Sequence, residues 1–386
     1  ERLVHMSKPA ARELVSPRAP IVIADLRADA EAAGLPVALL SPDTDTLGVM
    51  LPTTPLHALL FEPLPGDPTP SFELLVMTSG NRGGEPICIT NDEARDRLTG
   101  IADAFLLHDR EINLRNDDSL VVDPFVLTSS ETSKRQDGAL QTWRRARGFA
   151  PNSLRIARPL QRRVLAMGAE LKNCIALGCG NEIVLSPHIG DLSTPEALDG
   201  LAQVVGVFPE FFRQAPERVA VDRHPDMHAT RLGRRVAAEQ GLEVFEVQHH
   251  HAHAAAAMAE HGLEHALALV FDGTGLGDDG TLWGAELMAV TRTAYERLGS
   301  FAAVPLPGGD AAVRQPVRQL VARAQAAGLE LSEEQRRRLN LTEEELALWT
   351  LQCSRGLNAP LTHAAGRLFD AAAVAVGAAP RELSYE

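Results

Sequence analysis

Two stretches of this chain repeat one pattern, in which an apolar run of strand length leads into a polar turn rich in glycine and then into another strand. The first is VLAMGAELKNCIALGCGNEIVL, from Val164 to Leu185, and the second is LVFDGTGLGDDGTLWGAEL, from Leu269 to Leu287. A glycine turn between strands can hold a phosphate through its free backbone N–H groups. Because the pattern occurs twice, we expect two related α/β halves that bind one nucleotide.

Helices and strands alternate between the two stretches. The pattern predicts helices at Pro195–Val207 and Ala229–Gln240, with strands at Val219–Asp222 and Val244–Val247. Within the first stretch we expect a turn that carries Lys172 and Asn173, and a second tight turn at 178–181. The duplication is typical of the actin-like ATPase fold, so the predicted fold class is α/β throughout.

A histidine-rich segment, VQHHHAHAAAAMAEHG, leads into the second stretch. Its alanines favour a helix that ends at Gly262, a residue suited to the left-handed turn after a helix. If that helix begins near His249, then His249 and His253 are four residues apart and project from one face. Two imidazoles at this spacing are typical of metal ligands.

Asp272 ends the apolar run Ala266–Phe271 and is followed at once by Gly-Thr-Gly. A carboxylate at a strand end, beside glycines with free N–H groups, can hold a phosphate directly or through a cation. Together with His249 and His253 it forms a donor set that suits zinc or ferrous iron. The alternative is a solvated helix start followed by an ordinary hairpin, since a lone HxxxH pair is a weak motif.

The part of the chain before residue 128 contains a second candidate site. The predicted strand Leu74–Met77 runs into TSGNRGGEPI, whose hydroxyls, amide and glycines could bind an anion or form a plain polar loop. Thr128–Gln141 is polar and rich in breaking residues, so a domain boundary is predicted there. The arginine cluster in WRRARGFAP could bind phosphate, although a solvated strand end or ion pairs between domains explain it equally well.

Further along the chain, Ser332 with Gln335 and Thr342 with Glu345 predict two capping boxes. Leu361–Gly377 predicts a helix of small residues.

Composition narrows the class of protein. A chain of 386 residues has room for two or three domains. A formal charge of -14 argues against a surface that coats nucleic acid. The four cysteines are scattered and form no CxxC pair, which disfavours a disulfide framework or a structural zinc finger. No apolar run approaches the length of a membrane span, and the first residues lack a signal core, so we expect a cytoplasmic protein without membrane contact.

Ten motifs occur in the order found in the HypF-type carbamoyltransferases of [NiFe] hydrogenase maturation, which the chain resembles over essentially its whole length. They are MTSGNRGGEPI, HDREINLRNDDSLV, RRARGFAP, MGAELKNCIAL, LSPHIGDL, VDRHPDMHATRL, VQHHHAHAAAAMAEHG, FDGTGLGDDGTLWGAEL, PLPGGDAAVRQP and AAGRLFDA. The resemblance implies a YrdC-like domain at residues 1–127, a linker at 128–142 and an actin-like-fold carbamoyltransferase domain at 143–386. It also implies that both domains are truncated, the first at its N-terminus and the second at its C-terminus.

The same resemblance implies a reaction. In this family carbamate derived from carbamoyl phosphate is adenylated with ATP, and the carbamoyl group then passes to the C-terminal cysteine of a HypE-type protein, which provides the cyanide ligand of the hydrogenase iron. The cofactors expected are therefore ATP, with magnesium, and a divalent metal, zinc or ferrous iron. The partners expected are carbamoyl phosphate or carbamate and a HypE-type acceptor, with no nucleic acid.

Site residues follow from the positions of the family motifs. The resemblance implies metal ligands at His249, His253 and Asp272 and catalytic roles for Lys172 and Asp310. It implies nucleotide or substrate contacts at Thr78, Ser79, Asn81, Asn173, Asp272, Gly273, Thr274, Gly275, Gly308 and Gly309.

The chain departs from the family pattern in several places. Pro187 stands where glutamine is usual, and Gln315-Pro316-Val317 stands where EPW is usual. We expect that the chain lacks the acylphosphatase and CxxC regions of the family, and that it lacks a C-terminal segment that supplies a further aspartate to the metal. The resemblance therefore implies carbamoyltransferase activity for the longer parent protein and leaves the activity of this chain undecided. Three alternatives remain. The chain could be an antibiotic O-carbamoyltransferase, a non-catalytic fragment that binds maturation partners, or a tRNA-modifying protein, which the acidic net charge disfavours.

Overall fold

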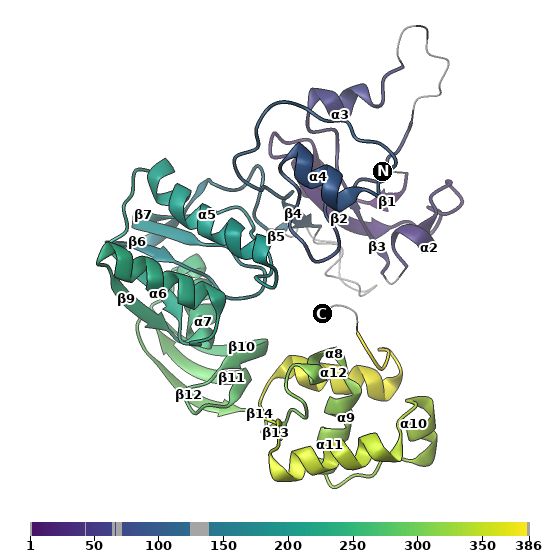
Figure 1. Ribbon diagram of the computed structural model, residues 1–386, viewed down its shortest axis with the longest axis vertical. Helices are drawn as coiled ribbons and strands as arrows, with labels where there is room; N and C mark the ends of the chain where they lie inside the picture. Colours follow the sequence, from purple (N-terminus) through teal and green to yellow (C-terminus); the bar gives the residue numbers. More distant parts are fainter. Residues whose placement is uncertain (1, 43, 64–65, 67–71, 124–138, 384–386) are drawn as a thin grey trace. The chain divides into compact units, whose positions relative to one another are not determined.

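The computed structural model describes the chain except for residues 1, 43, 64–65, 67–71, 124–138 and 384–386 (Figure 1). Its contacts divide it into two compact units. The first contains residues 1–219 and 231–244, and the second contains residues 220–230 and 245–386. Most of the predicted linker lies outside the described residues.

The first unit begins with a sheet of five strands in the order β1-β2-β4-β5, with β3 paired to β2. Strand β2 lies antiparallel to β1 and β3 but parallel to β4. The elements of this part are β1 Val4–His5, α1 Lys8–Leu14, β2 Ile21–Leu26, α2 Val37–Leu40, β3 Thr46–Val49, α3 Pro55–Leu59, α4 Asn91–Leu98, β4 Leu120–Val122 and β5 Gln141–Arg144.

A second sheet follows, with strands in the order β7-β6-β8-β9. Its strands β6 and β7 form a long antiparallel pair, and the division between the two units runs through β8 and β9. The elements are β6 Ser153–Ala166, β7 Ala176–Leu185, α5 Pro195–Phe211, β8 Arg218–Asp222, α6 His228–Gln240 and β9 Glu243–Val247. The helices and strands predicted between the two glycine-rich stretches are thus confirmed.

The second unit is built on a sheet of order β10-β11-β14-β13, with β12 paired to β11. Helix α7 packs on β10 and β11 through Ala254 and Met258, which share a buried core with Val270 and Trp283. The elements are α7 His249–His261, β10 His265–Leu276, β11 Leu282–Thr291, β12 Tyr295–Ser300, β13 Val304–Pro305, α8 Ala311–Arg314, α9 Val317–Ala326, α10 Glu333–Arg338, α11 Glu343–Arg355, β14 Leu361–Thr362 and α12 Ala365–Val376.

Helices α9, α11 and α12 form a separate helical core in the second unit. Val317 and Val321 of α9, Trp349 of α11 and Val374 of α12 are buried together. Both predicted capping boxes are present and start α10 and α11, because each hydroxyl accepts from the N3 backbone N–H while the N3 side chain accepts from the cap.

The tight turn predicted at 178–181 is wrong, because these residues lie inside the continuous strand β7. The pairing of β6 with β7 shifts register there, opposite Leu160, and Gly180 takes a positive φ of 56°. A Cβ on Gly178 would lie 2.4 Å from Cδ1 of Leu160. Glycine at this position therefore permits a bulge and a close approach within a strand instead of reversing the chain.

Two other predicted elements differ from the structure. Leu74–Met77 forms no strand among the described residues, and Val76 is 75% exposed, since an apolar run becomes a strand only where a neighbour completes its hydrogen bonds. The predicted helix Leu361–Gly377 begins four residues later, because Leu361 and Thr362 form the short strand β14 beside β13.

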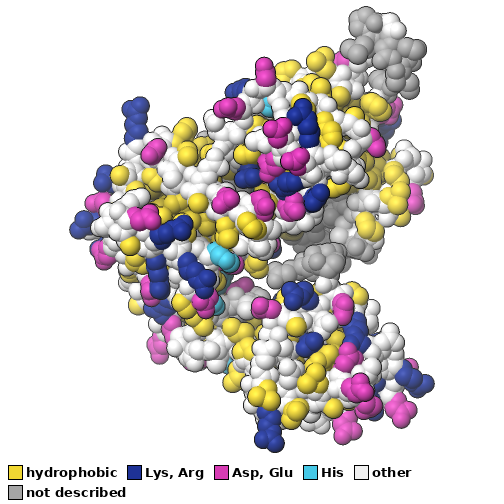
Figure 2. Space-filling model, in the orientation of Figure 1, with side chains coloured by type: hydrophobic (Ala, Val, Ile, Leu, Met, Phe, Trp, Pro, Cys, Tyr) yellow, Lys and Arg dark blue, Asp and Glu magenta, His cyan; other side chains and the backbone are white. Residues whose placement is uncertain are grey.

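In the part of the chain that the structure describes, no helix combines the length and the apolar character that a membrane crossing requires. On the face drawn in Figure 2, basic and acidic side chains are interspersed, as over α10 and α11, and they form no continuous basic surface.

Candidate metal and nucleotide site

Helix α7 presents the histidines because its first turn is capped. The side chain of Gln248 accepts a hydrogen bond from the backbone N–H of His251 at 2.9 Å, which fixes the start of the helix at His249. The helix ends at Gly262, which has a φ of 64° as predicted for a left-handed cap. His249 and His253 therefore lie one turn apart, with their Nε2 atoms 3.3 Å from each other.

Strand β10 brings a carboxylate to this pair. Its pairing with β11 is interrupted between Phe271 and Gly275, and the irregular segment begins with Asp272. One oxygen of Asp272 accepts from the N–H of Gly273 at 2.7 Å, while Oδ2 lies 3.2 Å from Nε2 of His249. One ligand atom from each of His249, His253 and Asp272 lies within 4.8 Å of the others. The sequence-predicted metal ligands therefore meet in space.

One donor atom of this triad is poorly satisfied by the protein alone. Oδ2 of Asp272 is buried and accepts no hydrogen bond of good geometry. A buried carboxylate oxygen is costly when its nearest donor, here Nε2 of His249 at 3.2 Å, is poorly aligned, and a bound cation would offset that cost. Two imidazoles and a carboxylate fit a divalent ion of the zinc or iron type, so the residues present suit the metal that the sequence suggests.

Asp222 contacts His249 on the side of the ring away from Asp272. Its Oδ2 lies 2.7 Å from Nδ1 of His249, and its Oδ1 accepts from the N–H of His224 at 2.8 Å. Burial disfavours the charged imidazole, but the hydrogen bonds and negative charges of Asp222 and Asp272 outweigh it and raise the pKa of His249 to about 9. Sequence reasoning gave Asp222 no role, although it too ends a predicted strand, as Asp272 does.

Its neighbour His250 has the opposite environment. The ring is fully buried and its Nε2 has no hydrogen-bond partner. Burial, followed by the charge of His249, lowers the pKa of His250 to about 4, so the ring is neutral. A Cβ on Gly275 would lie 2.5 Å from Cε1 of His250 and 3.0 Å from Cδ2 of His249. Gly275 is therefore needed for the fit between the hairpin and the histidine helix.

The start of α12 packs tightly on the same hairpin. A Cβ on Gly366 would meet the Cα of Gly273 at 3.1 Å, and one on Gly284 would meet the backbone oxygen of Asp272 at 2.6 Å and Cβ of Ala364 at 2.8 Å. The small residues of the AAGR segment thus allow the backbone of α12 to reach the Asp272–Gly273 segment. Thr274, by contrast, is exposed.

The loop Gly308–Asp310 lies in the second unit, where its hydrogen bonds go to residues other than the triad. Gly308 donates its N–H to the backbone oxygen of Asn358 at 2.7 Å, and Arg318 donates to the oxygen of Pro307 at 3.4 Å. Asp310 stands before α8 but makes no side-chain cap bond. These contacts fix the loop and assign it no partner in the metal triad.

Lys172 and Asn173 lie in the first unit, in the turn between β6 and β7. Lys172 has a positive φ of 49°, and its backbone N–H donates to Asp191 at 2.6 Å. The amide of Asn173 donates to the backbone oxygens of Met167 at 3.0 Å and Ala169 at 2.6 Å. Asn173 therefore holds the turn in shape, while its Oδ1 is buried without a partner.

The predicted TSGN site also lies in the first unit. Thr78, Ser79 and Asn81 are partly or fully exposed. The hydroxyl of Ser79 donates to the side chain of Asn81, whose amide donates to the backbone oxygens of Arg82 and Glu85, each at 2.9 Å. These bonds make TSGN a stable turn with exposed polar groups.

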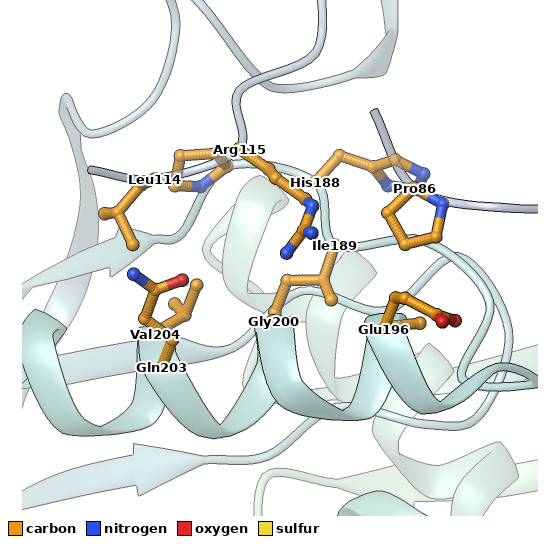
Figure 3. A pocket seen from close by; sticks show the side chains of 11 residues that line it. Pro86, Leu114, Arg115, His188, Ile189, Glu196, Gly200, Gln203 and Val204 are labelled. Carbon is orange, nitrogen blue, oxygen red and sulfur yellow. The ribbon is translucent and has the colours of Figure 1, made fainter. Parts of the chain in front are cut away.

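A small pocket in the first unit joins motifs that are far apart in the sequence (Figure 3). Arg115 points toward α5, where its Nη1 lies 3.7 Å from the position of a Cβ on Gly200. His188 of the SPHIGDL segment lies beside it, and burial, followed by the charge of Arg144, lowers the pKa of His188. The pocket is lined by Pro86, Leu114, Arg115, Pro187, His188, Ile189, Glu196, Ala197, Gly200, Gln203 and Val204.

Three family descriptions match successive parts of the chain. Residues 2–131 match the Sua5/YciO/YrdC family, described as "Telomere recombination". Residues 159–260 match the "HypF Kae1-like domain", and residues 268–386 match "Carbamoyltransferase, Kae1-like Domain, second subdomain". The order is a YrdC-like part followed by a Kae1-like part, which confirms the predicted fold class.

Among the curated relatives, carbamoyltransferase HypF2 of Cupriavidus necator is 43% identical over 94% of this chain and 44% of its own length. Carbamoyltransferase HypF of Rhodobacter capsulatus is 39% identical over 100% of this chain and 49% of its own length. The chain therefore spans about half the length of the curated relatives it matches.

Two solved structures have the same fold. A crystal structure of full-length HypF in a phosphate- and nucleotide-bound form matches with a TM-score of 0.84 and 33% identity, over 100% of this chain and 56% of that one. The structure of HypF from T. kodakarensis matches with a TM-score of 0.84 and 31% identity, over 100% of this chain and 49% of that one.

Proposed function

Because the chain belongs to the HypF family of carbamoyltransferases, we propose that it carries the ATP-dependent carbamoyl-transfer chemistry of that family. Carbamate from carbamoyl phosphate is adenylated at the YrdC-like part, and the carbamoyl group is transferred at the Kae1-like part. The observation that carries this proposal is the meeting of His249, His253 and Asp272 at the glycine hairpin that begins with Gly273.

The triad is the proposed metal site. Nε2 of His249, a ring nitrogen of His253 and Oδ2 of Asp272 would hold a zinc or ferrous ion, because Nδ1 of His249 is already engaged by Asp222. Such an ion supplies Lewis-acid polarisation of phosphate and carbamoyl oxygens when it is bound. The protein itself then contributes a preformed donor set, in which one ring is held in place by a second carboxylate.

The remaining roles belong to the same proposal. The backbone leaves the regular ladder between Phe271 and Gly275, and we propose that N–H groups of the Gly273–Gly275 segment donate to nucleotide phosphates. Lys172 and Asp310 are proposed to act in the transfer step. Asn173, Gly308 and Gly309 are proposed to contact the nucleotide. Thr78, Ser79 and Asn81 would contact the adenylate in the YrdC-like part, which is proposed to span residues 1–127, before a linker at 128–142 and the transferase part at 143–386.

Substrates and partners follow from the family. ATP with magnesium and carbamoyl phosphate or carbamate are the proposed substrates, and the acceptor is the C-terminal cysteine of a HypE-type protein. A cytoplasmic location is part of the proposal. The solved HypF that binds phosphate and nucleotide supports ATP binding, since it matches the whole of this chain.

Metal content tests the observation that carries the proposal. Purified chain should contain near-stoichiometric zinc or iron by mass spectrometry, and the His249→Ala, His253→Ala double variant should lose it. His261→Ala is the matched control, because His261 lies exposed at the other end of the same helix. ATP turnover that depends on carbamoyl phosphate, measured with a HypE-type acceptor, tests the reaction. Absence of metal from the unaltered chain would favour a non-catalytic binding role instead.

A further inference from the structure

Two arginines, one from α9 and one from α12, approach the start of α12, which packs on the glycine hairpin. Arg367 lies in the first turn of α12, and its Nε is 3.1 Å from Oδ2 of Asp370, one turn further along. Arg323 of α9 approaches the same helix, with its Nη2 3.5 Å from the backbone oxygen of Ala364. Two guanidinium groups and one carboxylate leave this cluster with an excess positive charge.

The excess charge is buried. The Arg367 side chain is only 11% exposed, and its Nε and Nη1 atoms are buried with no hydrogen bond of good geometry. The Nε of Arg323 is in the same condition. Burying a guanidinium without satisfying its N–H groups costs free energy, so a purely structural ion pair accounts poorly for this arrangement.

The guanidinium of Arg367 is directed at the hairpin. Its Nη2 atom lies 3.6 Å from the position that a Cβ on Gly273 would occupy. Gly273 follows Asp272, whose carboxylate belongs to the metal triad, and Gly366 brings the backbone of α12 against the Cα of Gly273. The absence of side chains at both glycines therefore lets a cation approach the backbone of the turn.

We propose that Arg367 binds a phosphate oxygen of the nucleotide held at the Gly273–Gly275 hairpin, and that Arg323 and Asp370 position its guanidinium. This inference rests on the proposed function for the identity of the ligand, but its chemistry requires only an oxyanion. A guanidinium offers paired N–H donors that match the oxygens of a phosphate group. The phosphate would give an acceptor to Nη2, the guanidinium nitrogen that faces the hairpin.

Calorimetric titration of the zinc-loaded chain with ADP tests the assignment. Arg367→Met should weaken ADP binding by about 10- to 100-fold, the range expected for lost charge-assisted hydrogen bonds. Arg367→Lys should restore part of that loss, because it keeps the charge without the planar fork. Zinc content should be unchanged in both variants. A purely structural arginine would give no such partial rescue of affinity at constant metal content.

Arg338→Met is the matched control. Arg338 donates to the backbone oxygens of Val374 and Ala375 at the opposite end of α12, so its loss perturbs the same helix away from the hairpin. ADP affinity should stay within about twofold of the unaltered chain in this variant, since no charge-assisted bond to the ligand is lost. An Arg367→Met protein that binds ADP as tightly as the control would overturn the proposal.

Titration with inorganic pyrophosphate separates this proposal from the proposed function. If the unaltered chain binds pyrophosphate but not ADP, the nucleotide part of the proposed function fails. Loss of pyrophosphate binding in Arg367→Met then still supports an oxyanion-binding arginine. If the unaltered chain binds neither, the assignment of Arg367 is wrong as well. Thermal unfolding without ligand adds a check, because an arginine whose main role is the ion pair with Asp370 would lower the melting temperature when replaced.

Discussion

Nδ1 of His249 lies 2.7 Å from Oδ2 of Asp222, so a carboxylate from the end of β8 fixes the ring that begins α7. Asp222 is 9% exposed, and burial opposes its charge, but the hydrogen bond and charge of His249 outweigh this and lower its pKa. The carboxylate is thus ionised and leaves Nε2 of His249 as the ring nitrogen that faces Asp272. Carboxylate, imidazole and metal in this order is a common arrangement that raises ligand basicity.

Asp222→Asn should weaken zinc binding by about 10- to 100-fold, because it removes the charge that orients and polarises His249. Competition with a chromophoric chelator measures the affinity. Asp226→Asn is the control, since Asp226 is exposed in the loop that follows β8. Equal zinc affinity in the Asp222→Asn protein and the control would mean that the contact is structural only.

Gly275→Ala should disturb the metal site through sterics alone. Its Cβ would lie 2.5 Å from a carbon of His250 and 3.0 Å from a carbon of His249, so both rings must shift. Overpacking of this kind costs about 1 to 3 kcal/mol. We expect a lower urea midpoint together with reduced zinc content. Gly299→Ala, where a Cβ meets open space, should change neither; a Gly275→Ala protein that behaves in the same way would show that the rings adapt freely.

Tyr295 provides a pH-dependent signal near the second hairpin. Its hydroxyl donates to Asp278 at 2.5 Å and accepts from Arg223 at 2.7 Å. Burial, followed by the hydrogen bond to Asp278, raises the pKa of Tyr295 to about 12. A raised pKa favours the protonated form in the folded state, so the stabilisation is complete below pH 10, the unfolded value, and is lost as the pH rises toward 12.

Absorbance at about 295 nm reports the ionisation of tyrosine, whose phenol has a usual pKa of about 10. The sequence contains two tyrosines, so a Tyr385→Phe background isolates the signal of Tyr295. In that background, Asp278→Asn should move the Tyr295 midpoint down toward 10, because the acceptor charge is lost. A midpoint that stays near 12 would assign the shift to burial alone.

The sequence was sufficient to predict the elements that form the metal triad. Local sequence signals predict both elements. A run of alanines that ends at a glycine predicts α7, and two strand-like runs around a glycine-rich turn predict the hairpin that carries Asp272. The spacing of His249 and His253 then depends only on helix geometry. Asp272 required one further step, since its approach to the histidines depends on the packing of α7 against β10.

Residues that contribute to the site through tertiary packing could not be predicted from the sequence. Asp222 and Arg367 are distant in sequence from the residues they face, so no local period marks them. The turn predicted at 178–181 failed for a related reason, because glycine favours a turn and a strand bulge alike, and only the neighbouring strand β6 decides between them. The strand predicted at Leu74–Met77 failed because a strand depends on a partner that its own residues do not specify.

Glu286 is a buried carboxylate in β11 that hydrogen-bonds to the backbone next to the metal triad. Its side chain is 0% exposed, and it accepts from Nε of Arg297 at 2.6 Å and from the backbone N–H groups of Gly284 and Ala285 at 3.0 and 3.3 Å. Gly284 packs on the backbone oxygen of Asp272. The carboxylate therefore fixes the β11 backbone next to the triad.

Arg297→Met should destabilise the chain strongly, by about 3 to 5 kcal/mol, because it leaves the Glu286 charge buried and uncompensated. Arg297→Met combined with Glu286→Gln should recover part of the loss, since the neutral amide keeps an oxygen for the backbone N–H groups. Urea unfolding of the two variants measures the difference. If the double variant is no more stable than the single one, the contribution of Arg297 comes from its packing over Trp283, 4.3 Å from the ring centre, and not from its charge.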